Sequence, residues 1–219
     1  MAEAESLALQ EPLEAHIRRH NYDRLLMLSD GVFAIATTLA AIEIKLPHGD
    51  TLGAMLSAGR TQLIAYLLSF ALTAVFWIQH RDMFARLRRV DQPLTILTLA
   101  LLCLVAAIPS AIHVVYAEGG TGAPFRYYAL LMGVIGLISF AMWAYVLARP
   151  GLMDPAVPAA FRLTRLVTTG MAPLILLPAM IVPVDQLGIV ILPIAAVVLV
   201  VRRWLVPWVV RRQPQLFAG

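Results

Sequence analysis

The chain alternates between long apolar stretches and short polar loops. Most of the stretches run for about 15 to 25 residues, which is close to the length at which an α-helix crosses the hydrocarbon core of a bilayer. They fall at about 25–46, 61–80, 94–116, 126–148, 166–183 and 187–206. This pattern predicts an all-α membrane protein with six transmembrane helices.

Four prolines lie inside these predicted helices, where each removes a backbone hydrogen bond. We therefore expect kinks in the third, fifth and sixth helices, at Pro109, Pro173, Pro178 and Pro193.

Composition supports a membrane protein and excludes an ordinary water-soluble domain. Of the 219 residues, 60% are hydrophobic and 14% are charged, and the mean hydropathy is +0.80. With six spans, 14 of the 17 basic residues fall on one side of the membrane. Because loops rich in Lys and Arg stay in the cytoplasm, both termini are expected inside, and the loops near Asp50, Gly119 and Asp185 outside. The net charge of +4 is explained by this topology, so we expect no nucleic-acid partner.

The same pattern gives the domain organisation. We expect a cytoplasmic segment at 1–24, a six-helix transmembrane channel domain at 25–206 and a short cytoplasmic tail at 207–219.

The first predicted helix carries an acidic residue, Asp30, inside an apolar run. An ionisable group at membrane depth costs several kcal/mol unless it is paired or hydrated, so it marks a functional or architectural site. If the helix starts one turn later, Asp30 is instead an interfacial residue or an N-cap.

This helix resembles the first helix of the endosomal and lysosomal potassium channels and their prokaryotic relatives, which carries Arg, three residues, then Phe-Ser-Asp. Arg24, Ser29 and Asp30 match in register, and Leu28 replaces the phenylalanine. A second match runs from Tyr66 to His80 in the second helix. In the third helix, Thr98 stands where the family has an asparagine. The resemblance implies a homotetrameric, potassium-permeable channel in a bacterial inner membrane, with K⁺ as the permeant ion and no resident cofactor.

Helix geometry divides the residues of the first helix between two faces. At 100° per residue, Ile35, Leu39 and Ile42 lie within about 60° of one another, with Thr38 at the edge of the stripe. Asp30 lies about 140° from Ile35, so it is expected to point into the surrounding bundle. In the family this stripe lines the pore and its apolar layers form the constriction. For an arbitrary membrane helix the same stripe would face lipid or a neighbouring helix.

The second helix presents one polar and aromatic face, which we expect to be turned from lipid. Its residues fall within an arc of about 80°: Tyr66, Ser69, Thr73, Trp77 and His80. Trp77 and His80 come near the cytoplasmic side, as does Asp30. We therefore expect an inter-helix polar network of Arg24, Ser29, Asp30, Trp77 and His80.

Two other classes of function are considered. A proton-coupled secondary transporter would use Asp30, His80 and His113, but the chain has no internal repeat. An intramembrane enzyme is not supported, since the sequence has neither His-Glu-x-x-His nor Gly-x-Ser-x-Gly, and we expect no catalytic residue and no metal ligand. The chain also lacks the Thr-Val-Gly-Tyr-Gly stretch of a carbonyl filter, so any selectivity must come from side chains such as Thr38.

Overall fold

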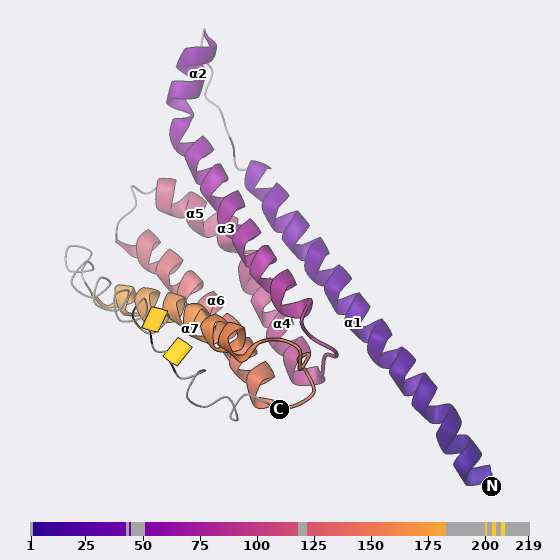
Figure 1. Cartoon of the computed structure of the whole chain (residues 1–219). Helices are drawn as coiled ribbons and strands as arrows, with labels where there is room; N and C mark the ends of the chain where they lie inside the picture. The colour runs from indigo at the N-terminus through magenta and orange to yellow at the C-terminus, as the bar shows by residue number, and fades with distance from the viewer. Residues whose placement is uncertain are drawn as a thin grey trace.

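The structure is a computed structural model that describes residues 2–42, 44, 51–117 and 122–182, with short pieces at 200, 203–204 and 207–208. The predicted sixth helix and the three loops expected outside lie almost entirely beyond these residues. Within them the chain is helical and forms no β-strand. The elements are α1 (Ala2–Ile42), α2 (Leu52–Ala58), α3 (Arg60–Phe84), α4 (Gln92–Val105), α5 (Ile108–Ala117), α6 (Ala123–Ala148), α7 (Ala159–Leu176) and the 3₁₀-helix η1 (Pro178–Met180) (Figure 1).

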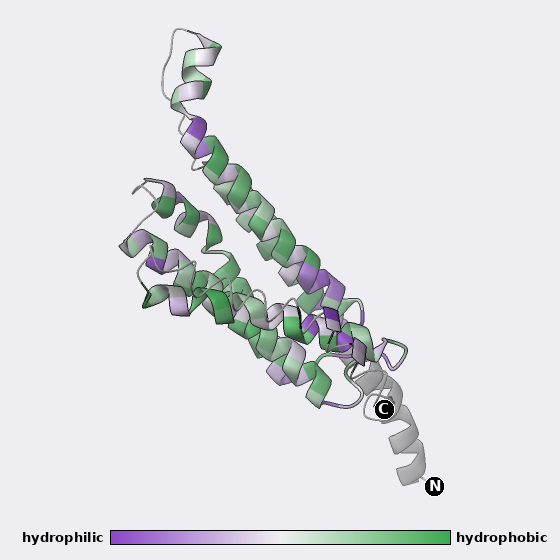
Figure 2. Ribbon diagram, turned by 60° about the vertical axis from the view of Figure 1, so that its left-hand side comes forward, coloured by the Kyte–Doolittle hydropathy of each residue, from purple (hydrophilic) through white to green (hydrophobic). Residues whose placement is uncertain are grey.

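Four stretches of the described residues are long and apolar enough to cross a membrane: Arg19–Ile42, Arg60–Phe84, Gln92–Ala117 and Ala123–Ala148. They correspond to the first four predicted spans. Figure 2 shows hydrophobic residues along these helices and hydrophilic ones gathered at the end of the bundle where α3 ends and α4 begins.

Helix α1 is longer than the predicted first span, because it begins at Ala2. The preceding segment, expected to be a cytoplasmic segment at 1–24, is rich in the strong helix formers Ala, Glu and Leu, so the helix extends without a break out of the apolar run. In Figure 1 the N-terminal part of α1 projects well past the other helices.

The predicted third span is broken into α4 and α5 at Ala106 and Ala107. Pro109 comes two residues after Ala107 and has no N–H to donate to the carbonyl of Val105, so the regular hydrogen bonding of the α-helix is interrupted here. The expected kink is confirmed here.

Helix α7 starts seven residues before the predicted fifth span of 166–183 and ends at Leu176. The hydropathy pattern missed its first two turns because Arg162 and Arg165 interrupt the apolar run. Pro158, which fixes a helix-compatible φ, precedes the true start. Pro173 lies inside the helix, and Pro178 opens η1 where the α-helix stops.

Helix α6 lies at the centre of the bundle, where it packs against α4, α5 and α7, while α3 packs against α1 and α5. The core between them is apolar, and its largest fully buried side chains include Phe33, Phe84, Leu94, Ile135 and Met142.

The contact between α6 and α7 depends on Gly136. A Cβ at this position would lie 2.7 Å from both Cβ of Ala172 and Cδ of Pro173, closer than packed atoms approach. Small residues at such crossings let the backbones of membrane helices come together.

Gly136→Ala is therefore expected to destabilise the bundle by about 1–3 kcal/mol through overpacking, despite alanine's higher helix propensity. Gly53→Ala is the matched control, because a Cβ on Gly53 in α2 would meet nothing within 4 Å. The control should instead gain about 0.5–1 kcal/mol. Thermal unfolding of both variants in detergent checks this, and an equal response of the two would contradict a close α6–α7 crossing.

Candidate pore-lining face and polar network

Helix α1 has one buried face and one exposed face. Leu25, Ser29, Phe33, Ala36 and Ala40 are all buried against the other helices. These positions are three or four residues apart, as expected for one face of a packed helix.

The opposite face carries the residues predicted to form the constriction. Ile35 is 59% exposed, Leu39 44% and Ile42 72%. Together with exposed positions at the same four-and-three spacing they form a continuous line, here called the exposed α1 stripe: Arg24, Leu28, Gly31, Ile35, Thr38, Leu39 and Ile42. The described helices of this chain leave Ile35, Thr38, Leu39 and Ile42 uncovered, whereas Arg24 and Leu28 border an open hollow at the start of α4.

Thr38 is the hydroxyl-bearing residue of the stripe. Its Oγ1 donates to the carbonyl oxygens of Ala34 and Ile35, both at 3.0 Å. The donor hydrogen is therefore used within the helix, and the lone pairs of Oγ1 remain for an approaching cation or water.

Asp30 lies beside the stripe and contacts α3. Its Oδ1 accepts a hydrogen bond of 2.9 Å from the indole Nε1 of Trp77. The guanidinium of Arg81 lies over the ring of Trp77, 4.9 Å from its centroid. The indole thus joins a carboxylate at its edge to a cation at its face, an arrangement that suits both groups electrostatically. Sequence reasoning paired Asp30 with Trp77 but did not include Arg81.

Ser29 and His80 are buried but are not bonded to Asp30. The hydroxyl of Ser29 donates to the carbonyl of Leu25 at 2.8 Å, the usual local bond of a serine inside a helix. The His80 ring lies between Phe33 and Phe84, with ring centroids 5.6 and 4.3 Å away. Among the described residues its Nε2 has no hydrogen-bond partner.

Arg24 lies on the exposed α1 stripe and faces the start of α4. It lines an open hollow of about 540 Å³ with Asn21, Leu28 and Asp91. Asp91 is the N-cap of α4, accepting from the N–H of Leu94 at 3.1 Å, and it also accepts from the hydroxyl of Tyr145 on α6. Arg24 is therefore placed near an acidic residue of another helix rather than beside Asp30.

The predicted inward face of the second helix is confirmed. On α3, Ser69, Thr73 and His80 are buried, and Tyr66 and Trp77 are half-buried.

A second polar cluster near the same end was missed by sequence reasoning. Asp82 on α3 forms ion pairs with Arg86 and with Arg165 of α7. Both guanidinium groups also lie over the ring of Phe161, at 4.3 and 5.1 Å from its centroid. The spacing of Asp82 and Arg86 by four residues was the available signal. The partnership with Arg165 depends on how α7 packs, which no local pattern encodes.

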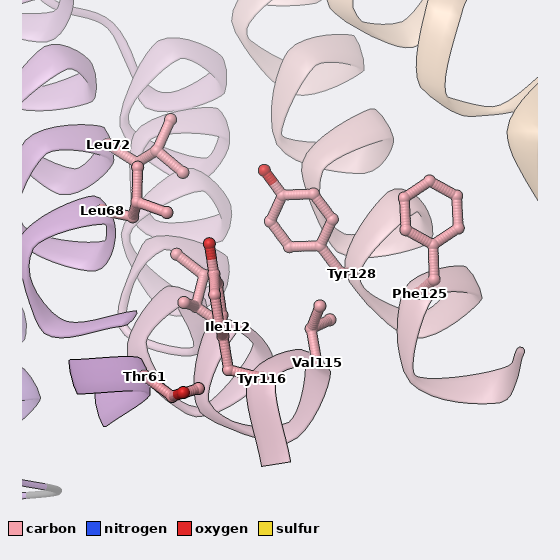
Figure 3. Close-up of a pocket in the computed structure, with 8 residues that line it drawn as sticks. All are labelled: Thr61, Leu68, Leu72, Ile112, Val115, Tyr116, Phe125 and Tyr128. Carbon is pink, nitrogen blue, oxygen red and sulfur yellow. The ribbon is translucent and has the colours of Figure 1, made fainter. Parts of the chain in front are cut away.

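At the other end of the bundle, residues of α3, α5 and α6 line an open hollow of about 740 Å³ (Figure 3). Its lining includes Leu68, Leu72, Ile112 and the rings of Tyr116 and Tyr128, and no lining side chain is charged. In Figure 3, Tyr128 points into the space between α3 and α6. A hollow of this chemistry does not stabilise a bare cation, so we do not assign it to ion conduction.

Comparison with known proteins places these features in context. Residues 24–109 match the family described as "Endosomal/lysosomal potassium channel TMEM175". A potassium channel of Streptomyces collinus is 35% identical over 151 residues, which cover 65% of this chain and 73% of that protein. The "Endosomal/lysosomal proton channel TMEM175" of Bos taurus is 27% identical over 160 residues, and the match spans only 32% of its length.

The fold is also similar to a crystal structure described as a lysosomal potassium-selective channel TMEM175 homologue from Chamaesiphon minutus. The TM-score is 0.59 at 24% identity, covering 88% of this chain and 98% of that one. The segment that matches the family model starts at Arg24 and ends at Pro109. It therefore contains the exposed α1 stripe and the Asp30–Trp77 pair. This chain belongs to the TMEM175 family of membrane channels.

Proposed function

We propose that the chain is one subunit of a homotetrameric, potassium-permeable cation channel in a bacterial cell membrane. In this proposal each chain spans the membrane six times with both ends in the cytoplasm, and the first helix of each subunit lines the pore. The Streptomyces collinus relative is itself named a potassium channel.

The observation that carries the proposal is the exposed α1 stripe. A face turned to lipid would be apolar throughout, whereas this stripe carries the hydroxyl of Thr38 between Ile35 and Ile42. Apart from Leu39, which directly follows Thr38, its residues alternate at spacings of four and three, the repeat by which helices pack around a common axis. A single helix cannot enclose a conduit, so self-association is required.

In such an assembly, Ile35, Leu39 and Ile42 would form stacked apolar rings, because all three are exposed on α1. Rings of branched side chains resist wetting and set a barrier to a hydrated cation. The hydroxyl oxygens of Thr38, one per subunit, are the polar atoms nearest this constriction and are our candidates for contacting the ion.

The transporter alternative is not favoured. His113 lines a small void with Ala40 and Gln62, whereas Asp30 lies ten residues before Ala40, about 15 Å away along α1. Asp30, His80 and His113 therefore do not meet at one site. A coupled transporter would be expected to bring such groups together near the membrane midplane.

Flux measurements in liposomes test the proposal. Purified protein reconstituted under a potassium gradient should pass K⁺ without saturable, stoichiometric coupling, and should exclude N-methylglucamine. A pH-sensitive dye inside the same liposomes measures proton flux separately, since the Bos taurus relative is named a proton channel. Flux of K⁺ no higher than in empty liposomes, with tetramers intact, would reject the proposal.

A further inference from the structure

A third open hollow, of about 800 Å³, lies at the end of the bundle that we assign to the cytoplasm. Three segments meet there: the first turns of the α1 span, the loop between α3 and α4, and the turn after α6. Each adjoins the end of a membrane-crossing stretch, so the hollow lies at the depth of the lipid headgroups.

The backbone holds two of these segments together. The N–H of Arg88 donates to the carbonyl of Leu152 at 2.8 Å, and the N–H of Asp154 donates to the carbonyl of Arg86 at 2.9 Å. Leu87 is buried beneath this bridge. The arginines of the loop are therefore presented from a fixed backbone rather than from a free tail.

Helix α1 is hydrogen-bonded to the end of α3, next to the loop that carries Arg88 and Arg89. The hydroxyl of Tyr22 donates to the carbonyl of Phe84 at 2.7 Å. This contact sets Arg19 and Asp23, which flank Tyr22 on α1, opposite the loop that carries Arg88 and Arg89.

Gly151 lines one wall of the hollow and contributes no side chain to it. Its φ is +83°, and a Cβ there would lie 3.4 Å from Nη2 of Arg89. The guanidinium of Arg89 thus lies close over the glycine backbone. A side chain at this position would be strained and would crowd the arginine.

The charge of the lining favours an anion. Arg19, Arg88 and Arg89 stand against the single carboxylate of Asp23. Arg88 also reaches Asp154 at 3.4 Å, but both side chains are exposed, so the pair is weak and leaves guanidinium donors free. Asp154 is not part of the lining of the hollow. The hydrogen bond from the N–H of Ala156 and, secondarily, the one from Arg88 lower the pKa of Asp154, so its carboxylate stays ionised.

We propose that this hollow binds the phosphate of an anionic phospholipid in the cytoplasmic leaflet. Arg19 and Arg89 hold the phosphate oxygens from opposite walls, because the planar fork of arginine matches phosphate geometry. Asp23 accepts a hydrogen bond from a headgroup hydroxyl, such as those of phosphatidylglycerol. Basic pockets at the cytoplasmic ends of membrane helices suit such headgroups. The binding itself does not rest on the proposed conduction pathway.

Calorimetric titration of the full-length, delipidated protein in a non-ionic detergent tests the proposal. Short-chain phosphatidylglycerol should bind at least about tenfold more tightly than short-chain phosphatidylcholine, because the choline cation neutralises the headgroup charge and offers no hydroxyl to Asp23. Arg19→Gln with Arg89→Gln should abolish this preference. Arg60→Gln, an exposed arginine at the opposite end of α3, should leave it intact.

Two further arms make the result decisive. Arg19→Lys with Arg89→Lys keeps the charge but not the fork, and should weaken binding by less than the glutamine pair. Inorganic phosphate and glycerol 3-phosphate identify the source: competition at millimolar concentration supports phosphate recognition and makes a free anion a second ligand. Equal binding by the glutamine pair and the wild type, or equal loss in Arg60→Gln, would overturn the proposal. Thermal unfolding without lipid confirms that each variant is folded.

Discussion

Leu39→Ser is expected to raise cation flux through reconstituted channels by about tenfold, equivalent to lowering the barrier by about 1.4 kcal/mol. Leu39 is 44% exposed on α1, between the levels of Ile35 and Ile42. In an assembly around the first helix, four leucines at this level exclude water from the axis. Serine removes the branched side chain and adds a hydroxyl that hydrogen-bonds water, so the ring wets more readily.

The opposite substitution provides the converse result. Leu39→Trp adds volume at the level that we propose to be the constriction and should lower flux to near the background of empty liposomes. Leu39→Ala should fall between serine and wild type, with weaker preference for potassium over sodium because the wider ring lets ions keep more of their water.

The matched control is Leu67→Ser on α3. Leu67 is 62% exposed but lies outside α1, so the same loss of apolar surface should leave flux unchanged. Oligomer content is checked by light scattering before each flux measurement. If Leu39→Ser and Leu67→Ser behave alike with oligomers intact, Leu39 faces lipid and the exposed α1 stripe does not line a pore.

Hydropathy predicted the second and fourth spans to within a few residues. Helix α3 covers Arg60–Phe84 against a predicted 61–80, and α6 covers Ala123–Ala148 against 126–148. Both helices are bounded by strong local signals: Gly59 before Arg60 and the cluster of arginines after α3, and Gly122 and Pro124 at the start of α6. Where glycine, proline or clustered arginines bound an apolar run, the length of the run predicts the bounds of the helix to within a few residues.

The remaining boundaries depended on information that hydropathy does not carry. Helix α7 includes Arg165, whose charge is accommodated by the carboxylate of Asp82 and the ring of Phe161. It also includes Arg162, whose guanidinium donates to backbone carbonyls just before the helix, among them that of Val157 at 2.9 Å. A hydropathy window treats the same arginines as loop. The early start of α1 is a similar case, since the polar sequence before Arg19 has no apolar run to mark a helix.

Helix periodicity placed Ile35, Leu39 and Ile42 on one face of α1, and all three are exposed. The expectation that Asp30 points into the surrounding bundle is wrong, because Asp30 is exposed at the edge of the face that contacts α3. Periodicity did not say which partners each polar residue would find. Within the expected network, Asp30 and Trp77 are hydrogen-bonded, while the hydroxyl of Ser29 returns to its own helix. Such pairings depend on how far two helices are shifted along their axes and rotated relative to each other. The periodicity of α1 or of α3 alone does not determine this. The functional roles of these residues remain proposals.

The Asp30–Trp77 contact leads to the second large effect, on assembly. Asp30→Ala removes the acceptor of the indole Nε1 hydrogen bond and leaves a donor at membrane depth without a partner. The expected cost is about 1–3 kcal/mol of folding free energy, with a lower yield of intact oligomer. Denaturant unfolding in detergent and light scattering measure the two effects.

Conservative variants separate the hydrogen bond from the charge. Asp30→Asn keeps an oxygen that accepts from Trp77, so it should retain more stability than Asp30→Ala, and Trp77→Phe should lose a similar amount by removing the donor. Combining Asp30→Ala with Trp77→Phe should cost less than the sum of the two single variants, by a coupling energy of about 1 kcal/mol, because both remove the same interaction. Strict additivity would mean that the contact contributes nothing to stability. If Asp30→Ala assembles and unfolds like the wild type and changes only ion selectivity, then Asp30 faces the pore, and the rotation we assign to α1 is wrong.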